Sequence, residues 1–185
     1  MSDAVSALAG RSYEGFARVS EAGLQGMVTV RCDLASKALA KGLKALGLSV
    51  PAQRRIVTAD GRAALWMSPD ELLVLVPYPD AVPTVAALEK ALARDHALVA
   101  DVSDARALFR ISGARADQVL MKLCPVDFPA LPSGEVRRTR AAQVAAALWR
   151  SGGDELSLVC FRSVAGYVMG ILEHSARPGS ELFPG

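Results

Sequence analysis

No uncharged run in this sequence exceeds ten residues, and the longest is Ser163–Leu172. A membrane-spanning helix needs about 20 consecutive apolar residues, so the sequence predicts no transmembrane segment. The N-terminus carries Asp3 and lacks the basic-then-apolar layout of a signal peptide. We therefore predict neither insertion into a membrane nor secretion.

Neither sign of charge is in excess, because 21 basic side chains accompany 19 acidic ones. The chain has no general field to attract nucleic acid or an anionic bilayer, and we predict neither as a partner. Cysteine is scarce, and Cys32, Cys124 and Cys160 lie in or beside apolar runs without a Cys-x-x-Cys or Cys/His cluster. We expect buried, reduced thiols in a cytoplasmic protein and no metal site.

The common cofactor and nucleophile motifs are also missing. The sequence contains neither G-x-G-x-x-G nor G-x-x-x-x-G-K, and no G-x-S-x-G. We therefore predict no flavin or nicotinamide site in this chain alone. His96 and His174 fall at predicted helix ends, where histidines are usually solvated or act as C-terminal caps. No residue is predicted to be catalytic.

Apolar residues, in contrast, are abundant: 51% of the chain is hydrophobic and its mean hydropathy is positive. A small protein cannot hide all such surface internally, so some should remain as an apolar patch for a partner. The alternative is an alanine-rich composition that raises the mean hydropathy without forming a patch. Both interpretations remain open.

One stretch is repeated. Ala64–Val76 and Ala147–Val159 each contain an apolar run ending at a Trp, a turn with Ser and Pro or Gly, then Glu-Leu and a β-rich run. Ser68-x-x-Glu71 also matches a helix capping box, but the Leu-Leu-Val-Leu-Val that follows favours a hairpin. Landmarks in the two halves are offset by about 80 residues. The repeat predicts two similar halves.

Periodicity and turn signals divide each half into strands and helices. Strands are expected at 27–32, 54–58, 62–67, 71–76, 98–102, 107–111, 136–149 (broken near Ala141-Ala142) and 155–161. Helices are expected at 34–46 and 114–123. Two more are expected to begin at the N-terminal cap residues Asp80 and Ser163. On the last helix Val164, Tyr167, Val168, Ile171 and Leu172 are the expected buried face.

These elements predict an α+β fold of two pseudo-repeated, ferredoxin-like β-α-β-β-α halves, each with room for one extra strand. Each half has an antiparallel sheet with its helices on one face. The expected boundaries are an N-terminal arm at 1–25, ordered only if something holds it, halves at 26–102 and 103–173, and a C-terminal tail at 174–185.

Arg137, Arg138 and Arg140 form the densest basic cluster. Strand alternation would put Arg138 and Arg140 on one face, where they could contact an anionic ligand or an acidic partner surface. A solvated strand entry is the alternative. Asp101, Asp104 and Arg106 are expected to form local ion pairs and a turn, with Asp104 as the turn residue.

Several ordered blocks carry a resemblance to known proteins. Asp101-Val-Ser103 with the strand ending at Ser112-Gly113 resembles the folate-binding aminomethyltransferases of the glycine cleavage system. The blocks Arg62–Leu73, Asp101–Ala107, Cys124–Asp127, Arg138–Arg140 with Gln143-Val144, and Phe161–Val164 resemble the gamma-subunit family of heterotetrameric sarcosine oxidase. The match runs from about Gly26 to Leu172.

This resemblance implies a cytoplasmic complex that demethylates sarcosine oxidatively to glycine, with hydrogen peroxide and either formaldehyde or methylene-tetrahydrofolate as products. It implies alpha and beta partner subunits that carry FAD, FMN, NAD and tetrahydrofolate, a zinc-binding delta subunit, and no cofactor in this chain. In the aminomethyltransferases a carboxylate on the long strand before the hairpin works at the folate, whereas Gln143–Trp149 here has alanines. A non-catalytic subunit is expected. The alternatives are a free-standing folate-binding transferase or repair protein and a small-ligand regulatory domain.

Overall fold

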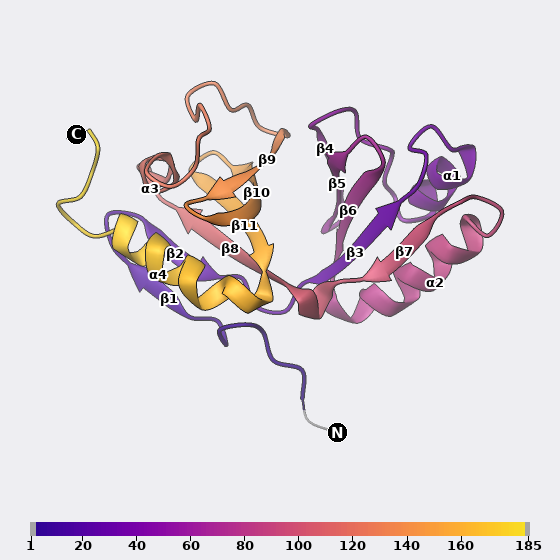
Figure 1. Cartoon of the computed structure of the whole chain (residues 1–185), viewed down its shortest axis with the longest axis horizontal. Helices are drawn as coiled ribbons and strands as arrows, with labels where there is room; N and C mark the ends of the chain where they lie inside the picture. The colour runs from indigo at the N-terminus through magenta and orange to yellow at the C-terminus, as the bar shows by residue number, and fades with distance from the viewer. Residues whose placement is uncertain (1–2, 184–185) are drawn as a thin grey trace. The chain divides into compact units, whose positions relative to one another are not determined.

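The computed structural model describes residues 3–183 and divides the chain into two compact units (Figure 1). Residues 25–103 form the first, called here the central unit. The described residues before and after it, 3–24 and 104–183, form the second, the terminal unit. Residues 1–2 of the predicted arm and 184–185 of the predicted tail lie outside the described residues. The central unit begins and ends one residue outside the predicted 26–102 half.

The central unit has a five-stranded antiparallel sheet in the order β4-β5-β6-β3-β7. Its strands are β3 (Gly26–Arg31), β4 (Ile56–Ala59), β5 (Arg62–Ser68), β6 (Glu71–Val76) and β7 (Leu98–Asp101). Its helices are α1 (Lys37–Ala45) and α2 (Ala81–Ala91), with the 3-10 turn η1 (Tyr78–Asp80) before α2. Asp60 and Gly61 both have positive φ, as the predicted two-residue hairpin requires.

The terminal unit has a six-stranded antiparallel sheet in the order β1-β2-β8-β11-β10-β9. Its strands are β1 (Ser12–Glu14), β2 (Arg18–Glu21), β8 (Arg106–Ser112), β9 (Val136–Ala141), β10 (Val144–Gly152) and β11 (Glu155–Phe161). Its helices are α3 (Ala116–Met121) and α4 (Ala165–Ser175), with the 3-10 turn η3 (Arg162–Val164) before α4. A further 3-10 turn, η2 (Ser103–Ala105), precedes β8.

The two units repeat one topology, and the predicted α+β fold with two antiparallel sheets is confirmed. β8, β9, β10 and β11 follow one another in the terminal unit as β3, β4, β5 and β6 do in the central unit. Three strands separate the helices in each unit, so the possible extra strand of the predicted plan is present. The predicted 136–149 strand is a hairpin that turns at Ala142, which has positive φ.

The N-terminal segment is not an extended arm. β2 pairs with β8, and β1 pairs with β2. The carboxylate of Glu21, 4% exposed, accepts hydrogen bonds from the Ser6 hydroxyl at 2.8 Å and the Gly10 N–H at 2.7 Å. Arg11 forms a two-pronged ion pair with Glu173 of α4. Residues 3–24 are therefore part of the terminal unit.

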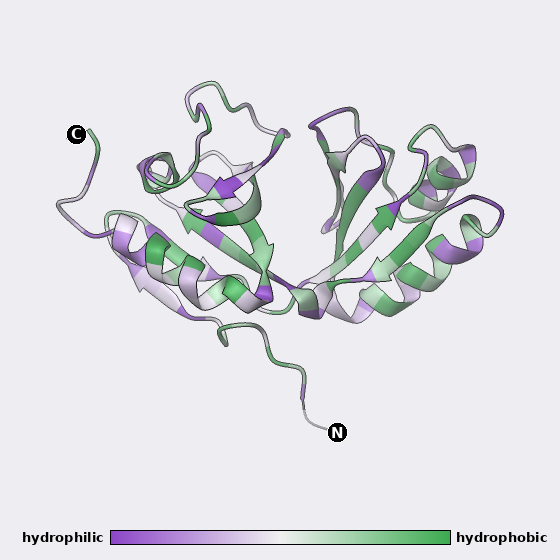
Figure 2. Ribbon diagram, viewed as in Figure 1, coloured by the Kyte–Doolittle hydropathy of each residue, from purple (hydrophilic) through white to green (hydrophobic). Residues whose placement is uncertain are grey.

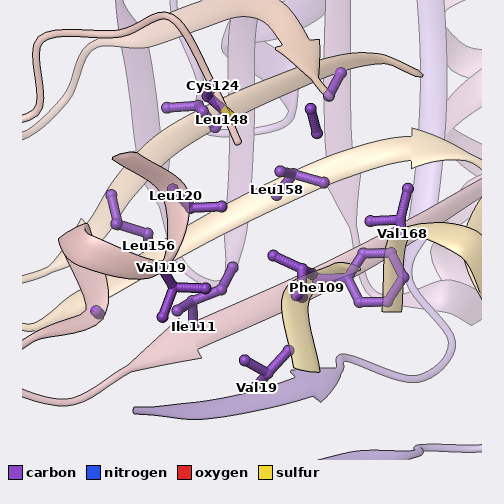
Figure 3. Packing of buried hydrophobic residues seen from close by; sticks show 14 of the residues in the cluster. Val19, Phe109, Ile111, Val119, Leu120, Cys124, Leu148, Leu156, Leu158 and Val168 are labelled. Carbon is purple, nitrogen blue, oxygen red and sulfur yellow. The ribbon is translucent and has the colours of Figure 1, made fainter. Parts of the chain in front are cut away.

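Each sheet packs its helices against one face. In the central unit Val28, Val30 and Val74 are fully buried in one cluster with Leu39 of α1 and Leu88 of α2. In the terminal unit Figure 3 shows Phe109 beside Val168, with Val119, Leu120, Ile111 and Leu156 in the same cluster. The predicted placement of helices on one sheet face is thus confirmed.

Three details of the helices differ from prediction. Asp80 makes no side-chain cap for α2, because its carboxylate binds Arg62 at 3.0 Å instead. Ser163 lies in η3, and no side chain caps α4. The buried face of α4 is Ala165, Val168, Met169 and Leu172, whereas Tyr167 is 47% exposed. The buried stripe is thus displaced by one residue from the predicted face, and Val164 and Ile171 remain partly buried against the core.

The predicted tail is also held in place. Residues 174–176 belong to α4 and its C-terminal cap. The Gln118 side chain accepts hydrogen bonds from the N–H groups of Leu182 and Phe183, and Arg115 pairs with Glu181 at 3.4 Å. α3 therefore anchors the C-terminal segment.

Candidate functional site

β10 is the strand on which the resemblance would place an acid. It reads Val-Ala-Ala-Ala-Leu-Trp-Arg-Ser-Gly, with Ala146 and Ala147 buried. Methyl groups cannot accept or donate a proton at these positions. The only ionisable side chain of β10 is Arg150, which binds Asp117 of α3 at 2.9 Å and braces the sheet. This strand offers packing rather than acid–base chemistry.

The basic cluster lies on β9, the edge strand next to β10. Its residues alternate in exposure, and Arg138 and Arg140 share one face, as predicted. Arg137 is directed to the other face and forms an ion pair with Glu135, which is 7% exposed. Arg140 binds the side chain of Gln143 at 3.0 Å. Figure 2 shows a hydrophilic stretch on β9 beside the more apolar strands. Arg138 and Arg140 thus present positive charge at the sheet edge.

The Asp101-Val-Ser103 motif has a structural role within the central unit. The Asp101 carboxylate accepts hydrogen bonds from both the N–H and the hydroxyl of Ser103. The Ser103 hydroxyl oxygen in turn accepts the Met27 N–H at 2.9 Å. The Asp101 side chain therefore forms a turn with Ser103 that ties the end of β7 to the start of β3, and Asp104 lies in the 3-10 turn η2 that follows.

Asp104 and Arg106 lie in the terminal unit with different partners. The Asp104 carboxylate is 3.9 Å from Arg162, and the Arg106 guanidinium stacks 4.5 Å from the centre of the Phe161 ring. Asp104 thus pairs with Arg162, which follows β11 and is distant in the sequence. These contacts fix the entry to α4.

The three thiols are buried, as predicted. Burial raises the pKa of both Cys124 and Cys160 from an ordinary 9.0 to about 12. Burial, with Asp95 and Asp33 nearby, also raises the pKa of Cys32. A nucleophilic cysteine needs a lowered pKa, so these thiols are structural. Within residues 3–183 no three His, Cys, Asp or Glu side chains gather as a metal site would require.

Two hollows lie at the start of β7 in the central unit. The first, of about 440 Å³, is lined by Arg31, Cys32, Asp33, Pro69, Asp70, His96, Ala97 and Leu98. The second, of about 320 Å³, is lined by Glu89, Leu92, Ala93, Asp95, Ala97, Leu98 and Val99. Sequence reasoning missed both, because their residues come from separate loops. The Ser68 hydroxyl hydrogen bond, helped by Arg31, lowers the pKa of Asp70 and favours its carboxylate.

The exposed large apolar side chains are spread over both units. They are Val5, Leu24, Val82, Leu98, Phe161, Tyr167, Leu182 and Phe183. Among the described residues no helix has the length and apolar character needed to cross a membrane.

Comparison with known proteins decides the family. A model described as "Sarcosine oxidase, gamma subunit family" matches residues 31–177. The chain belongs to this family. A curated relative, sarcosine oxidase subunit gamma from Corynebacterium sp. (strain P-1), is 32% identical over 150 residues, covering 79% of this chain and 73% of the relative.

Solved structures support the fold of this gamma-family chain. The heterotetrameric sarcosine oxidase from Corynebacterium sp. U-96 contains a similar chain, with a TM-score of 0.80 and 24% identity. That match covers 86% of this chain and 83% of the other. The aminomethyltransferase T of the glycine cleavage system from Bartonella henselae matches with a TM-score of 0.64 and 16% identity, over 85% of this chain and 45% of the other. Both resemblances read from the sequence are thus confirmed at the level of fold.

Proposed function

We propose that this chain is a non-catalytic gamma subunit of a cytoplasmic, heterotetrameric sarcosine oxidase complex. The complex would convert sarcosine, oxygen and water to glycine, formaldehyde and hydrogen peroxide, or pass the one-carbon unit to tetrahydrofolate. FAD, FMN, NAD and tetrahydrofolate would bind to the alpha and beta subunits, and a small delta subunit would complete the assembly. Membership of the gamma-subunit family supports this assignment.

The observation that carries the non-catalytic role is the composition of β10. A strand with Ala145, Ala146 and Ala147 keeps the fold shared with an aminomethyltransferase but supplies no general base. The raised pKa values of Cys124 and Cys160 add no nucleophile. The chain would contribute a binding surface for its partner subunits instead.

Co-expression with the other three subunits tests the proposal. A tag on another subunit should retain this chain in stoichiometric amount, and the purified complex should form hydrogen peroxide when sarcosine is added. This chain alone should be colourless and should not bind tetrahydrofolate stoichiometrically. Failure of the wild-type chain to copurify would overturn the assignment. Tight tetrahydrofolate binding by the chain alone would favour the alternative of a free-standing folate-binding protein. The similarity of fold to an aminomethyltransferase is the reason for this alternative.

Arg138 and Arg140 are proposed to meet an acidic surface of a partner subunit. Their shared, exposed face on an edge strand supports this role. The double variant Arg138→Gln/Arg140→Gln should weaken retention of the chain, and increasing salt should weaken retention of the wild type more than that of the variant. Lys41→Gln/Lys44→Gln on exposed positions of α1 is the control. Equal retention of both double variants would show that Arg138 and Arg140 are solvated and do not contact a partner subunit.

A further inference from the structure

The outer edge of β7 is unpaired among residues 3–183. β7 is the last strand of its sheet and pairs only with β3. The Val102 N–H donates to the Met27 carbonyl, so alternation along the antiparallel ladder directs the backbone groups of Ala100 and Leu98 toward β3. The N–H and C=O groups of Val99 and Asp101 consequently point away from the sheet.

In the terminal unit an additional strand covers the edge that corresponds to the outer edge of β7. There β2 lies beside β8 as β7 lies beside β3, and β1 covers the outer edge of β2. The terminal sheet has six strands and the central sheet has five. The strand that the central sheet lacks is the counterpart of β1, so the place beside β7 has the geometry for one more extended segment.

β7 is short and carries one charged residue, Asp101, but it lacks the basic side chains that often protect an edge strand. The edge strand β9 carries Arg137, Arg138 and Arg140, and the edge strand β4 follows Arg54 and Arg55. β7 reads Leu-Val-Ala-Asp, contains no cation, and leaves Leu98 55% exposed. Figure 2 shows β7 as largely hydrophobic. Such an edge favours addition of another strand.

The two hollows meet at the start of β7, because Ala97 and Leu98 line both. The first includes Arg31 and Leu98, which pair across β3 and β7 and lie on the face without helices. The second includes Leu92, at the end of α2, and Val99 on the helix-covered face. Side chains of an added strand alternate between faces, so successive ones would lie on the Leu98 side and on the Val99 side of the sheet.

The charge of the hollows indicates which side chains fit. Carboxylates outnumber basic groups around them: Asp33, Asp70, Glu89 and Asp95 against Arg31 and His96. Arg31 is already paired with Asp70 at 3.1 Å. The remaining carboxylates favour basic side chains, while Leu98 favours an apolar one.

We propose that an extended segment of another subunit, carrying basic and apolar side chains, adds to β7 as a sixth strand of the central sheet. The segment forms backbone hydrogen bonds with Val99 and Asp101 and covers Leu98. This inference rests on the proposed function, because it places a partner subunit of the complex at a defined edge.

Amide hydrogen exchange in the assembled wild-type complex tests the pairing. The N–H groups of Val99 and Asp101 should exchange slowly, on the order of a hundredfold slower than in unprotected backbone. The N–H groups of Leu98 and Ala100, which face β3, should also exchange slowly. Fast exchange at Val99 and Asp101 in an intact complex overturns the strand addition while the proposed function stands. A wild-type chain that does not copurify overturns the proposed function and this inference with it.

Proline substitution gives a second test. Val99→Pro removes an outward N–H without removing a hydrogen bond to β3, so the fold should tolerate it while retention in the complex falls at least about tenfold. Thr58→Pro on the edge strand β4 is the matched control, because the register of β4 with β5 also directs its N–H outward. Equal retention of both variants overturns the proposal. If the Val99 N–H of the isolated chain exchanged more slowly as the protein concentration rose, a second copy of this chain would be occupying the edge. That result would overturn the proposal of a segment from another subunit.

Discussion

The ammonium nitrogen of Lys122 lies 2.7 Å from the carbonyl oxygen of Ser180. The same ammonium donates to the Ser175 carbonyl at the end of α4, and it lies 5.0 Å from the centre of the Phe16 ring. Partial burial lowers the pKa of Lys122, while Glu181 opposes this shift and favours the charged form. One cation thus holds the C-terminal segment to the end of α3.

We predict that Lys122→Met releases residues 177–183. Three acceptors lose a charged donor, and hydrogen bonds to charged groups contribute about 1.5–3 kcal/mol each at most sites. Limited proteolysis should therefore cut after Arg177 faster in the variant, with a small fall in melting temperature. Lys41→Met, on the exposed face of α1, should change neither. Unchanged cleavage in Lys122→Met would show that Gln118 and Arg115 suffice to hold the segment.

Phe109→Ala should destabilise the terminal unit strongly. Phe109 is fully buried in the cluster with Val168 and Leu172, and removing a buried Phe side chain costs about 3–5 kcal/mol. Phe161→Ala is the control, because that ring is 48% exposed and its stacking with Arg106 contributes only about 0.5–1 kcal/mol. Urea unfolding of the two variants measures the difference. Similar losses would contradict the position of the core.

Gly170→Ala should stabilise the chain by about 0.5–1 kcal/mol. Gly170 lies inside α4, and a Cβ there would meet no atom within 4 Å. Gly26→Ala should do the opposite, since its Cβ would lie 2.7 Å from the Pro77 carbonyl oxygen. Thermal unfolding by circular dichroism ranks the three proteins. A melting temperature of Gly170→Ala below that of the wild type would contradict the open helix face.

Alkaline pH should destabilise the chain through its buried thiols. The raised pKa of Cys124 and of Cys160 means that the unfolded state releases a thiol proton above pH 9 while the folded state retains it until about 12. Stability therefore falls over this window, by about 1.4 kcal/mol per pH unit for each thiol. Urea unfolding at pH 8 and pH 10 should show a smaller decrease for Cys124→Ala/Cys160→Ala. An equal decrease in variant and wild type would assign the effect to other groups.

The strands at the centre of each unit could be predicted because their signals are local. The Asp60-Gly61 turn and the unbroken apolar run of β6 specify a hairpin without help from the rest of the chain. The repeat of these signals around Trp149 then predicted the second sheet. The missing carboxylate of β10 could likewise be read directly from the alanines.

Elements fixed by distant partners could not be predicted in this way. β2 reads Arg-Val-Ser-Glu, and Val19 is its only apolar residue, so the strand exists because the edge of β8 is available. In the sequence Asp80 has the position of a helix cap, but in the structure its carboxylate binds Arg62, 18 residues earlier. The hollows beside β7 also arise from loops that have no shared sequence pattern. Tertiary contacts, rather than propensity, decide these features.

The pairing of β2 with β8 also sets the order in which the chain can fold. Residues 25–103 form a complete unit, so they can fold on the ribosome before β8, the pairing strand of β2, has been synthesised. β2 can pair with β8 only after β8 has been synthesised, so the terminal unit closes last, across the whole of residues 25–103. Removing the first 21 residues would therefore spare the early-folding unit and leave the late one with a bare edge.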